Sequence, residues 1–308
     1  MRIISYQEQF HIADRTAVAL GKFDGVHLGH QRLIDHIVKA KEDGLLSAVF
    51  TFEIADDLSF KMSEDKVLST REEKRRLLDE LGVDILVEFP LNDRTAAIEP
   101  EDFITKYLCE GMNAALVVAG PDLSYGHMGK GDFHLLKSMQ KQCRCESFVV
   151  DKVFYEGQSI SSTRIRALLE EGNMEAVNAM LGRPYHILGK VRHGKKLGRT
   201  LGFPTVNQIP DEHKLLPAFG VYFSRVCIDG KYYNSITNIG VRPSVDDGDA
   251  VNAETFIYDF DGQIYDETIM VELVKFSRPE MKFESFEALK ARLLVDFDEG
   301  RAYHSTRG

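Results

Sequence analysis

The sequence predicts two domains: an α/β domain with a doubly wound parallel sheet, then a small antiparallel β-barrel-like domain that ends in a helix. Its 308 residues, 44% of them hydrophobic, are enough for two cores. In the first half, short continuous apolar runs alternate with helical patterns, which is typical of a parallel sheet covered on both faces. In the second half, short alternating strands are joined by Asp-Gly turns, which favours antiparallel pairing.

The first domain is expected to alternate strand and helix from its first apolar run onward. Strands are predicted at residues 17–20, 48–52, 85–89 and 115–119, and helices at residues 31–40, from Ser69 or Thr70 onward, and at 100–110. Two overlapping capping-box patterns begin at Ser69 and Thr70. Since ligands of such sheets bind beyond the carboxyl ends of the strands, we expect the turn after residue 20 and the loop after residue 119 to lie together.

The domain boundary is predicted after Gly182, where Gly and Pro interrupt the helical pattern, giving domains of residues 1–182 and 183–308. In the second domain, strands are predicted at 221–227, from 232, at 254–260 and at 269–274, with turns at Asp229-Gly230 and Asp261-Gly262. These segments are expected to form hairpins. An amphipathic helix is predicted around residues 286–294.

Composition excludes several classes of partner. A net charge of −10 argues against nucleic acid, because phosphate-backbone binding needs a basic face. No apolar run approaches a membrane-spanning length, and the first residues carry no secretory apolar segment. We therefore expect a cytoplasmic protein with no membrane partner. The four cysteines show no paired spacing, so reduced thiols are expected.

The block Gly21-Lys22-Phe23-Asp24-Gly25-Val26-His27-Leu28-Gly29-His30 lies between a predicted strand and a predicted helix. Two histidines three apart at a helix start present N–H donors, beside unpaired backbone amides, to a bound anion. Gly29 removes a side chain that would block a nucleotide. Such donors can stabilise the charge that develops as pyrophosphate leaves ATP. The alternative is a glycine turn with two surface histidines.

Two further segments combine hydroxyl, glycine and basic residues. Residues 160–166, Ile-Ser-Ser-Thr-Arg-Ile-Arg, open a predicted helix, where hydroxyls cap amides or bind phosphate and arginines neutralise it. A plain capped helix is the alternative. Residues 189–207 contain four glycines together with five lysines and arginines, which indicates an anion-binding loop.

These segments resemble one family over nearly the whole chain. Residues 21–30 resemble the His-x-Gly-His signature of prokaryotic bifunctional riboflavin kinase/FMN adenylyltransferases, and residues 160–166 resemble its second adenylyltransferase motif. Residues 189–207 resemble the flavokinase glycine-rich loop and its Pro-Thr-Ala-Asn motif, with Val206 in place of the alanine. The resemblance implies that the second domain phosphorylates riboflavin to FMN with ATP and Mg²⁺, and that the first adenylylates FMN to FAD, releasing pyrophosphate. Flavin is then substrate and product, and flavoproteins are candidate clients.

The resemblance also assigns the site residues. The catalytic set is His27, His30 and Glu254, the last as general base toward the riboflavin 5′-hydroxyl. The ATP- and phosphate-binding set is Gly21, Phe23, Asp24, Gly29, Ser162, Thr163, Arg164, Gly189, Gly194, Gly198, Arg199, Gly202 and Pro204. The flavin-binding set is Asp122, Tyr125 and Arg278, and the Mg²⁺ ligands are Thr205 and Asn207, whose neutral oxygens suit a hard cation.

Four segments depart from the family pattern: the turn from Glu53, the loop Leu123-Ser124-Tyr125-Gly126, the stretch around Arg242, and Tyr265-Asp266. The alternatives are an FAD synthetase whose kinase site is weakened or lost, and a flavin-sensing protein without turnover. A transferase for phosphopantetheine or nicotinamide mononucleotide would also carry His-x-Gly-His, but it would not need the glycine-rich loop of the second domain.

Overall fold

The computed structural model describes residues 1–54, 66–192, 205–244 and 248–306. The chain divides into two compact units, Met1–Ser162 and Thr163–Gly308, which we call unit 1 and unit 2. Helices α7 (Ser162–Glu170) and α8 (Met174–Leu181) precede the predicted boundary at Gly182. Asn178 of α8 donates to the carbonyl of Leu273 at 3.0 Å, so this helix packs with the barrel of unit 2. The boundary after Gly182 stays a prediction.

Unit 1 contains the predicted parallel sheet. Its strands are β1 (Arg2–Ser5), β2 (Thr16–Leu20), β3 (Leu46–Ile54), β4 (Ile85–Leu91), β5 (Ala114–Ala119) and β6 (Glu146–Val149), and a small hairpin, β7 (Phe154–Tyr155) and β8 (Gln158–Ser159), follows them. The six strands run in the order β1-β4-β3-β2-β5-β6, and every pair is parallel. The strand order reverses between β2 and β5. The two predicted ligand loops therefore begin at neighbouring strand ends, as expected for a doubly wound sheet.

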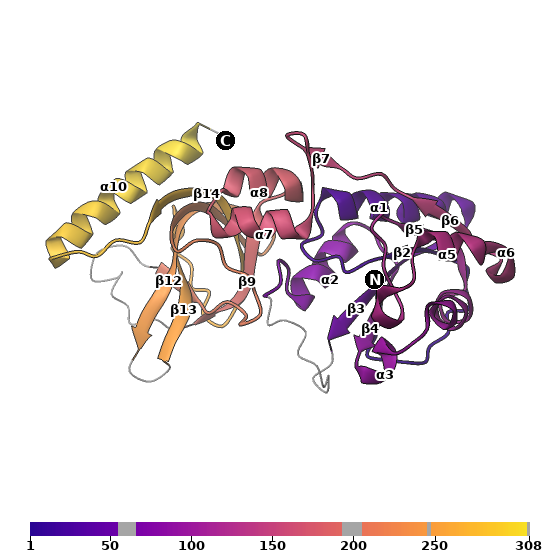
Figure 1. Ribbon diagram of the computed structural model, residues 1–308. Helices are drawn as coiled ribbons and strands as arrows, with labels where there is room; N and C mark the ends of the chain where they lie inside the picture. The colour runs from indigo at the N-terminus through magenta and orange to yellow at the C-terminus, as the bar shows by residue number, and fades with distance from the viewer. Residues whose placement is uncertain (55–65, 193–204, 245–247, 307–308) are drawn as a thin grey trace. The chain divides into compact units, whose positions relative to one another are not determined.

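Helices cover both faces of this sheet (Figure 1). They are α1 (Leu28–Lys39), η1 (Ala40–Asp43), α2 (Arg71–Glu80), α3 (Asp93–Ala96), α4 (Pro100–Asp102), η2 (Phe103–Gly111), η3 (His127–Gly129), α5 (Phe133–Ser138) and α6 (Gln140–Cys143). Ala17 and Ala19 of β2 pack on the side of α1 and α2, and Val18 and Leu20 on the side of η2. Both faces are buried, which explains the continuous apolar runs in the sequence.

Two predicted helices differ in detail from the expectation. Of the two capping-box patterns, the structure uses the second: the Thr70 side chain accepts from the amide of Glu73, and the Glu73 carboxylate accepts from the amide of Thr70. The helix predicted at 100–110 begins as α4 and continues as the π-helix η2, whose wider turn is uncommon and not readable from apolar spacing.

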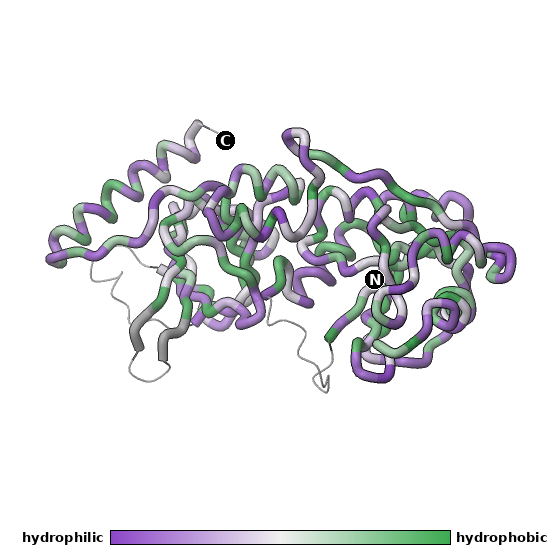
Figure 2. The backbone as a smooth tube through the Cα atoms, in the orientation of Figure 1, coloured by the Kyte–Doolittle hydropathy of each residue, from purple (hydrophilic) through white to green (hydrophobic). Residues whose placement is uncertain are grey.

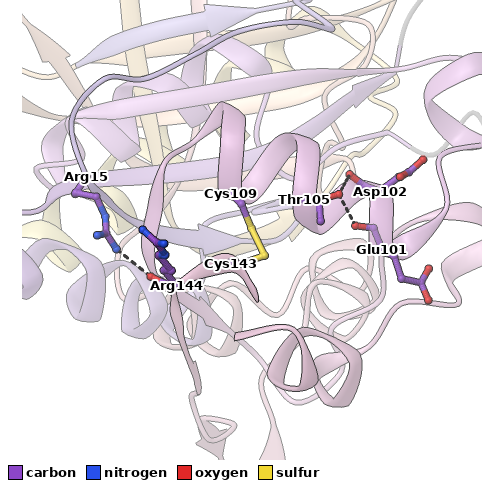
Figure 3. Close-up of a disulfide and its surroundings, with 7 residues drawn as sticks. All are labelled: Arg15, Glu101, Asp102, Thr105, Cys109, Cys143 and Arg144. Atoms are coloured by element: carbon purple, nitrogen blue, oxygen red, sulfur yellow. Dashed lines mark hydrogen bonds between the residues drawn. A yellow bond between two sulfur atoms is a disulfide. The ribbon is translucent and has the colours of Figure 1, made fainter. Parts of the chain in front are cut away.

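The prediction that the cysteines are reduced thiols is wrong for one pair. Cys109 of η2 and Cys143 of α6 form a disulfide, with their Cα atoms 5.5 Å apart (Figure 3). The two residues are 34 positions apart, and the packing of α6 against η2 brings them together. That separation is within the range that a disulfide requires, but no sequence spacing signals it. Cys145 and Cys227 are free.

Unit 2 is a closed antiparallel barrel with a terminal helix, as predicted. Its strands are β9 (Tyr185–Arg192), β10 (Thr205–Gln208), β11 (Gly220–Ile228), β12 (Lys231–Ser244), β13 (Gly248–Ile257) and β14 (Thr268–Pro279), and its last helix is α10 (Phe286–Ser305). The barrel order is β10-β13-β12-β11-β14-β9. The turn at Asp229-Gly230 joins β11 to β12, as expected.

The second predicted hairpin, across Asp261-Gly262, is wrong. β13 pairs with β10 and β12, whereas β14 pairs with β11 and β9. Closing the barrel requires these partners, because every strand needs a neighbour on both sides. Apolar and polar stretches alternate along α10 (Figure 2), and Phe297 packs with Phe223 and Tyr258 on the barrel wall.

Candidate active sites in the two units

The turn between β2 and α1 is strained. Phe23 has a φ of 51° and Val26 a φ of 40°, and both side chains are fully buried. A left-handed backbone is unfavourable for bulky residues and above all for a β-branched one. Residues in such conformations cost about 1–3 kcal/mol each and cluster at functional sites. Gly25, with a φ of 79°, adopts this region without that penalty.

His27 has two tasks at the start of α1. Its Nδ1 accepts a hydrogen bond from the backbone amide of His30 at 3.3 Å, so the histidine serves as the N-cap of the helix. A neutral imidazole that accepts at Nδ1 carries its proton at Nε2. A Cβ atom at Gly29 would lie 3.1 Å from the His27 ring. Gly29 therefore leaves room for this ring.

His30 lies in a buried stack of rings. Its ring centroid is 3.7 Å from that of His27, nearly parallel to it, and 5.1 Å from that of Phe23. Burial, followed by the nearby charges of His27 and Lys74, holds the pKa of His30 well below its usual value. The ring is therefore neutral near pH 7. Within the described part of the chain, its buried Nδ1 has no hydrogen-bond partner, as expected of an atom that pairs with a ligand.

Asp24 connects three segments at this turn. Its carboxylate accepts from the backbone amides of Leu68 at 2.8 Å and Ser69 at 3.3 Å, just before α2. Its carbonyl accepts from the Ser162 hydroxyl at 2.9 Å. The structure thus brings Ser162 of the second motif against the first motif. Asp24, predicted to bind phosphate, uses its carboxylate here to anchor the start of α2.

The remaining predicted residues of the first site are dispersed. Thr163 and Arg164 follow Ser162 in the first turn of α7 and belong to unit 2. A Cβ atom at Gly21 would lie 3.3 Å from the Phe23 ring, so this glycine accommodates that ring. Asp122 is exposed in the loop after β5 and forms an ion pair with Lys152 at 2.7 Å.

Tyr125, predicted to bind flavin, lies in the core of unit 1. Its side chain is 3% exposed and packs against Phe103 with ring centroids 5.4 Å apart. Its hydroxyl donates to the carbonyl of Asp132 at 3.1 Å. Burial raises its pKa far above the usual value for tyrosine. The structure gives this ring a packing role, and its contact with flavin stays a prediction.

A buried ion cluster that sequence reasoning missed lies on β1, β4 and α2. The Glu88 side chain is fully buried and accepts from Arg75 at 2.5 Å, from Arg71 at 2.7 Å and from the Ser5 hydroxyl. Burial opposes the charged form, but these hydrogen bonds outweigh it and lower the pKa of Glu88 to about 2. The cluster fixes α2 to the sheet. Its members are far apart in the sequence, so no local sequence pattern predicts the cluster.

In unit 2, strand register brings amide side chains to Glu254. Glu254 of β13 is directly opposite Asn207 of β10 and Asn238 of β12. Side chains in such cross-strand pairs have Cβ atoms about 5 Å apart. The Asn207 Oδ1 also accepts from Asn252 at 2.8 Å. The predicted base and a predicted Mg²⁺ ligand are therefore neighbours, and sequence reasoning missed Asn238 and Asn252.

The other predicted residues of unit 2 are partly described. Thr205 is opposite Phe256, two positions before Asn207 and therefore on the same side of β10. Gly189 lies in β9. The predicted phosphate-binding residues Gly194, Gly198, Arg199, Gly202 and Pro204 lie outside the described residues.

Arg278, predicted to bind flavin, is held by a carboxylate. Its Nε and Nη2 donate to Asp296 of α10 at 2.9 Å and 2.5 Å, and Asp296 is 1% exposed. Arg292 also pairs with Asp296, at 2.8 Å. The guanidinium therefore has a fixed orientation at the end of β14, and its contact with flavin stays a prediction.

Comparisons with known proteins agree across both units. A family described as FAD synthetase matches residues 9–164, and one described as riboflavin kinase matches residues 181–304. Two relatives, both called bifunctional riboflavin kinase/FMN adenylyltransferase, come from Listeria monocytogenes and Bacillus subtilis. The first is 38% identical over 289 residues and covers 93% of this chain and 91% of its own. The second is 34% identical over 299 residues and covers 94% and 93%.

A solved structure from Streptococcus pneumoniae, described as a macrolide-efflux protein, has a TM-score of 0.86 and 32% identity, and the match covers 97% of this chain and 98% of that one. In the residues described here, no helix has the length and apolar character needed to cross a membrane. The two family matches together span both units, and the relatives are matched over most of their length. The chain belongs to the family of bifunctional riboflavin kinase/FMN adenylyltransferases.

Proposed function

We propose that this chain phosphorylates riboflavin to FMN in unit 2 and adenylylates FMN to FAD in unit 1. The observation that carries the proposal is that each unit holds its own set of reactive groups: the His27–His30 stack in unit 1 and the Glu254–Asn207 pair in unit 2. Each set suits one of the two transfers, because the first offers donors to phosphate and the second offers a base beside oxygen ligands.

In the adenylylation, an oxygen of the FMN phosphate attacks the α-phosphorus of ATP. The bond from that phosphorus to the pyrophosphate oxygen breaks, and pyrophosphate leaves. The attacking phosphate is already ionised, so the protein needs no base. His27 and His30, whose rings are stacked, stabilise and orient the phosphates rather than form covalent bonds.

In the kinase reaction, Glu254 accepts the proton of the riboflavin 5′-hydroxyl as that oxygen attacks the γ-phosphorus of ATP, and ADP leaves. Asn207 and Asn238 flank the carboxylate across the sheet and can orient it by hydrogen bonding. We assign the flavin contacts to Asp122 and Tyr125 in unit 1 and to Arg278 in unit 2.

Mg²⁺ fits Thr205 and Asn207. Both offer neutral oxygens from the same side of β10, and Mg²⁺ prefers oxygen ligands while keeping several waters. In the described residues, no group of three His, Cys, Asp or Glu side chains could hold a metal. We propose that the cation arrives with ATP. Bound there, Mg²⁺ would neutralise charge on the transferring phosphates.

One incubation tests the proposal. Riboflavin, ATP and Mg²⁺ are mixed with the protein, and the products are separated by chromatography over time. We expect FMN to accumulate first and FAD to follow, with ADP and pyrophosphate released. FAD formed only from added FMN would mean a lost kinase site. Bound flavin without ATP consumption would mean a flavin-binding protein without turnover.

A further inference from the structure

Lys74 of α2 is an unusually buried cation. Its side chain is 9% exposed and forms an ion pair with Glu53 of β3, which is 18% exposed. Lysine is seldom buried unless it is paired. A buried ion pair gains little net stability, because desolvation offsets the attraction between the charges. Stability alone therefore gives little reason for this pair.

The pair lies at the ligand end of the sheet in unit 1. Glu53 is the penultimate residue of β3, and β3 neighbours β2, whose carboxyl end leads into the turn at residues 21–27. Lys74 is in the first turn of α2, and its amide donates to the carbonyl of the N-cap Thr70 at 2.8 Å. Asp24 anchors the residues just before this N-cap to the same turn. The starts of α1 and α2 therefore both lie at the turn of residues 21–27.

Lys74 also acts electrostatically on His30. Its ammonium is one of the charges that lower the pKa of the His30 ring, after burial and His27. The same positive charge would attract an anion bound beside that ring. Because Glu53 already neutralises Lys74, the site avoids an unpaired buried charge when no phosphate is bound.

We propose that Lys74 binds the phosphates of ATP in the adenylyl-transfer site of unit 1, with Glu53 holding its ammonium in position. This inference rests on the proposed function of that unit. The bond that forms joins an FMN phosphate oxygen to the α-phosphorus, and the bond that breaks releases pyrophosphate with the electron pair. Lys74 gives up no proton. Its charge stabilises the negative charge that moves onto pyrophosphate.

The decisive variant removes both partners. Lys74→Met alone would leave Glu53 as an unpaired buried charge, so its loss of activity could be structural. The double variant Glu53→Gln/Lys74→Met leaves no buried charge at this position. If Lys74 only neutralises Glu53, the double variant should regain FAD formation. If Lys74 binds phosphate, FAD formation from FMN should stay about 100-fold below wild type, as when an oxyanion donor is lost.

Two controls separate the site from general effects. Lys41→Met removes a comparable ion pair of unit 1, Lys41 with Asp84 at 2.8 Å, which is partly exposed and outside the site. It should leave FAD formation unchanged. Riboflavin phosphorylation by the same samples should also be unchanged in every variant, because that reaction belongs to unit 2. Thermal unfolding reports whether unit 1 is folded.

A charge exchange covers the case in which the double variant does not fold. Glu53→Lys/Lys74→Glu keeps an ion pair but moves the cation from α2 to β3, and we expect at least a 10-fold loss of FAD formation. Wild-type FAD formation in a folded double variant, or in the exchanged variant, would overturn the inference and leave the proposed function standing. Absence of FAD formation by the wild-type chain would instead refute the proposed function.

Discussion

Replacing Glu88 by glutamine should cost unit 1 about 3 kcal/mol of unfolding free energy at pH 7. The carboxylate is fully buried between Arg71, Arg75 and Ser5, and its pKa falls from an ordinary 4.5 to about 2. Since one pKa unit corresponds to about 1.4 kcal/mol, that fall corresponds to about 3 kcal/mol of stabilisation by the ionised form. Glutamine keeps the shape but loses the charge that both arginines require.

The pH dependence has a definite sign. Because folding lowers the pKa of Glu88, its contribution is present above about pH 4.5 and is lost as the pH falls from about 4.5 to about 2. The difference in stability between wild type and Glu88→Gln should therefore be largest near neutral pH and shrink toward pH 3.

Urea unfolding measures this difference. Circular dichroism follows the transition, because the chain has no tryptophan, and loss of FAD formation marks the unfolding of unit 1. Glu80→Gln is the matched control: Glu80 pairs with Arg76 on the surface of the same helix, and its side chain is 56% exposed. Such a pair is worth about 0.5 kcal/mol or less. A Glu88→Gln cost as small as that of the control, or one that does not change with pH, would refute the reasoning.

Three further predictions concern the two sites. His27→Asn should keep the N-cap of α1, and therefore a near-wild-type unfolding midpoint, but lose about 100-fold in FAD formation; full activity would remove the ring from the mechanism. Glu254→Gln should slow riboflavin phosphorylation by about 10²- to 10⁴-fold while FMN is still converted to FAD, and an unchanged kinase rate would show that this carboxylate is not the base. A chelator should silence both activities, and restoration should require Mg²⁺; activity that persists in excess chelator would contradict the assigned metal dependence.

The sequence predicted the features that depend on local pattern. Apolar runs and capping residues located the strands and the starts of α1 and α2 to within a few residues. The glycines with the two histidines predict the first site. The parallel, doubly wound arrangement followed from the alternation of strands and helices, whereas the order of the strands in the sheet was not predicted. The barrel was predicted as a class, but the partner of β14 was not, because closure is a property of all six strands together.

What could not be predicted depends on residues that are distant in the chain. Glu88 meets Ser5 and Arg71, and Cys109 meets Cys143, only because the fold brings their elements together. The hydrogen bond from Leu68 to Asp24, which anchors the start of α2, could not be predicted either, because the two residues are also distant in the chain. From the sequence, Glu53 was noted only as a departure from the family pattern. Its ion pair with Lys74 became visible only in the structure.

The central claim is that one chain holds two separate active sites, and mixing two inactive variants tests it directly. His30→Ala should convert riboflavin to FMN but form FAD about 100-fold more slowly than wild type, and Glu254→Gln should convert added FMN to FAD but phosphorylate riboflavin about 10²- to 10⁴-fold more slowly. An equal mixture of the two, given riboflavin, ATP and Mg²⁺, should form FAD, because FMN made by one chain is used by the other. FAD formation from riboflavin at the wild-type rate by either variant alone, or a mixture no faster than its parts, would contradict the claim.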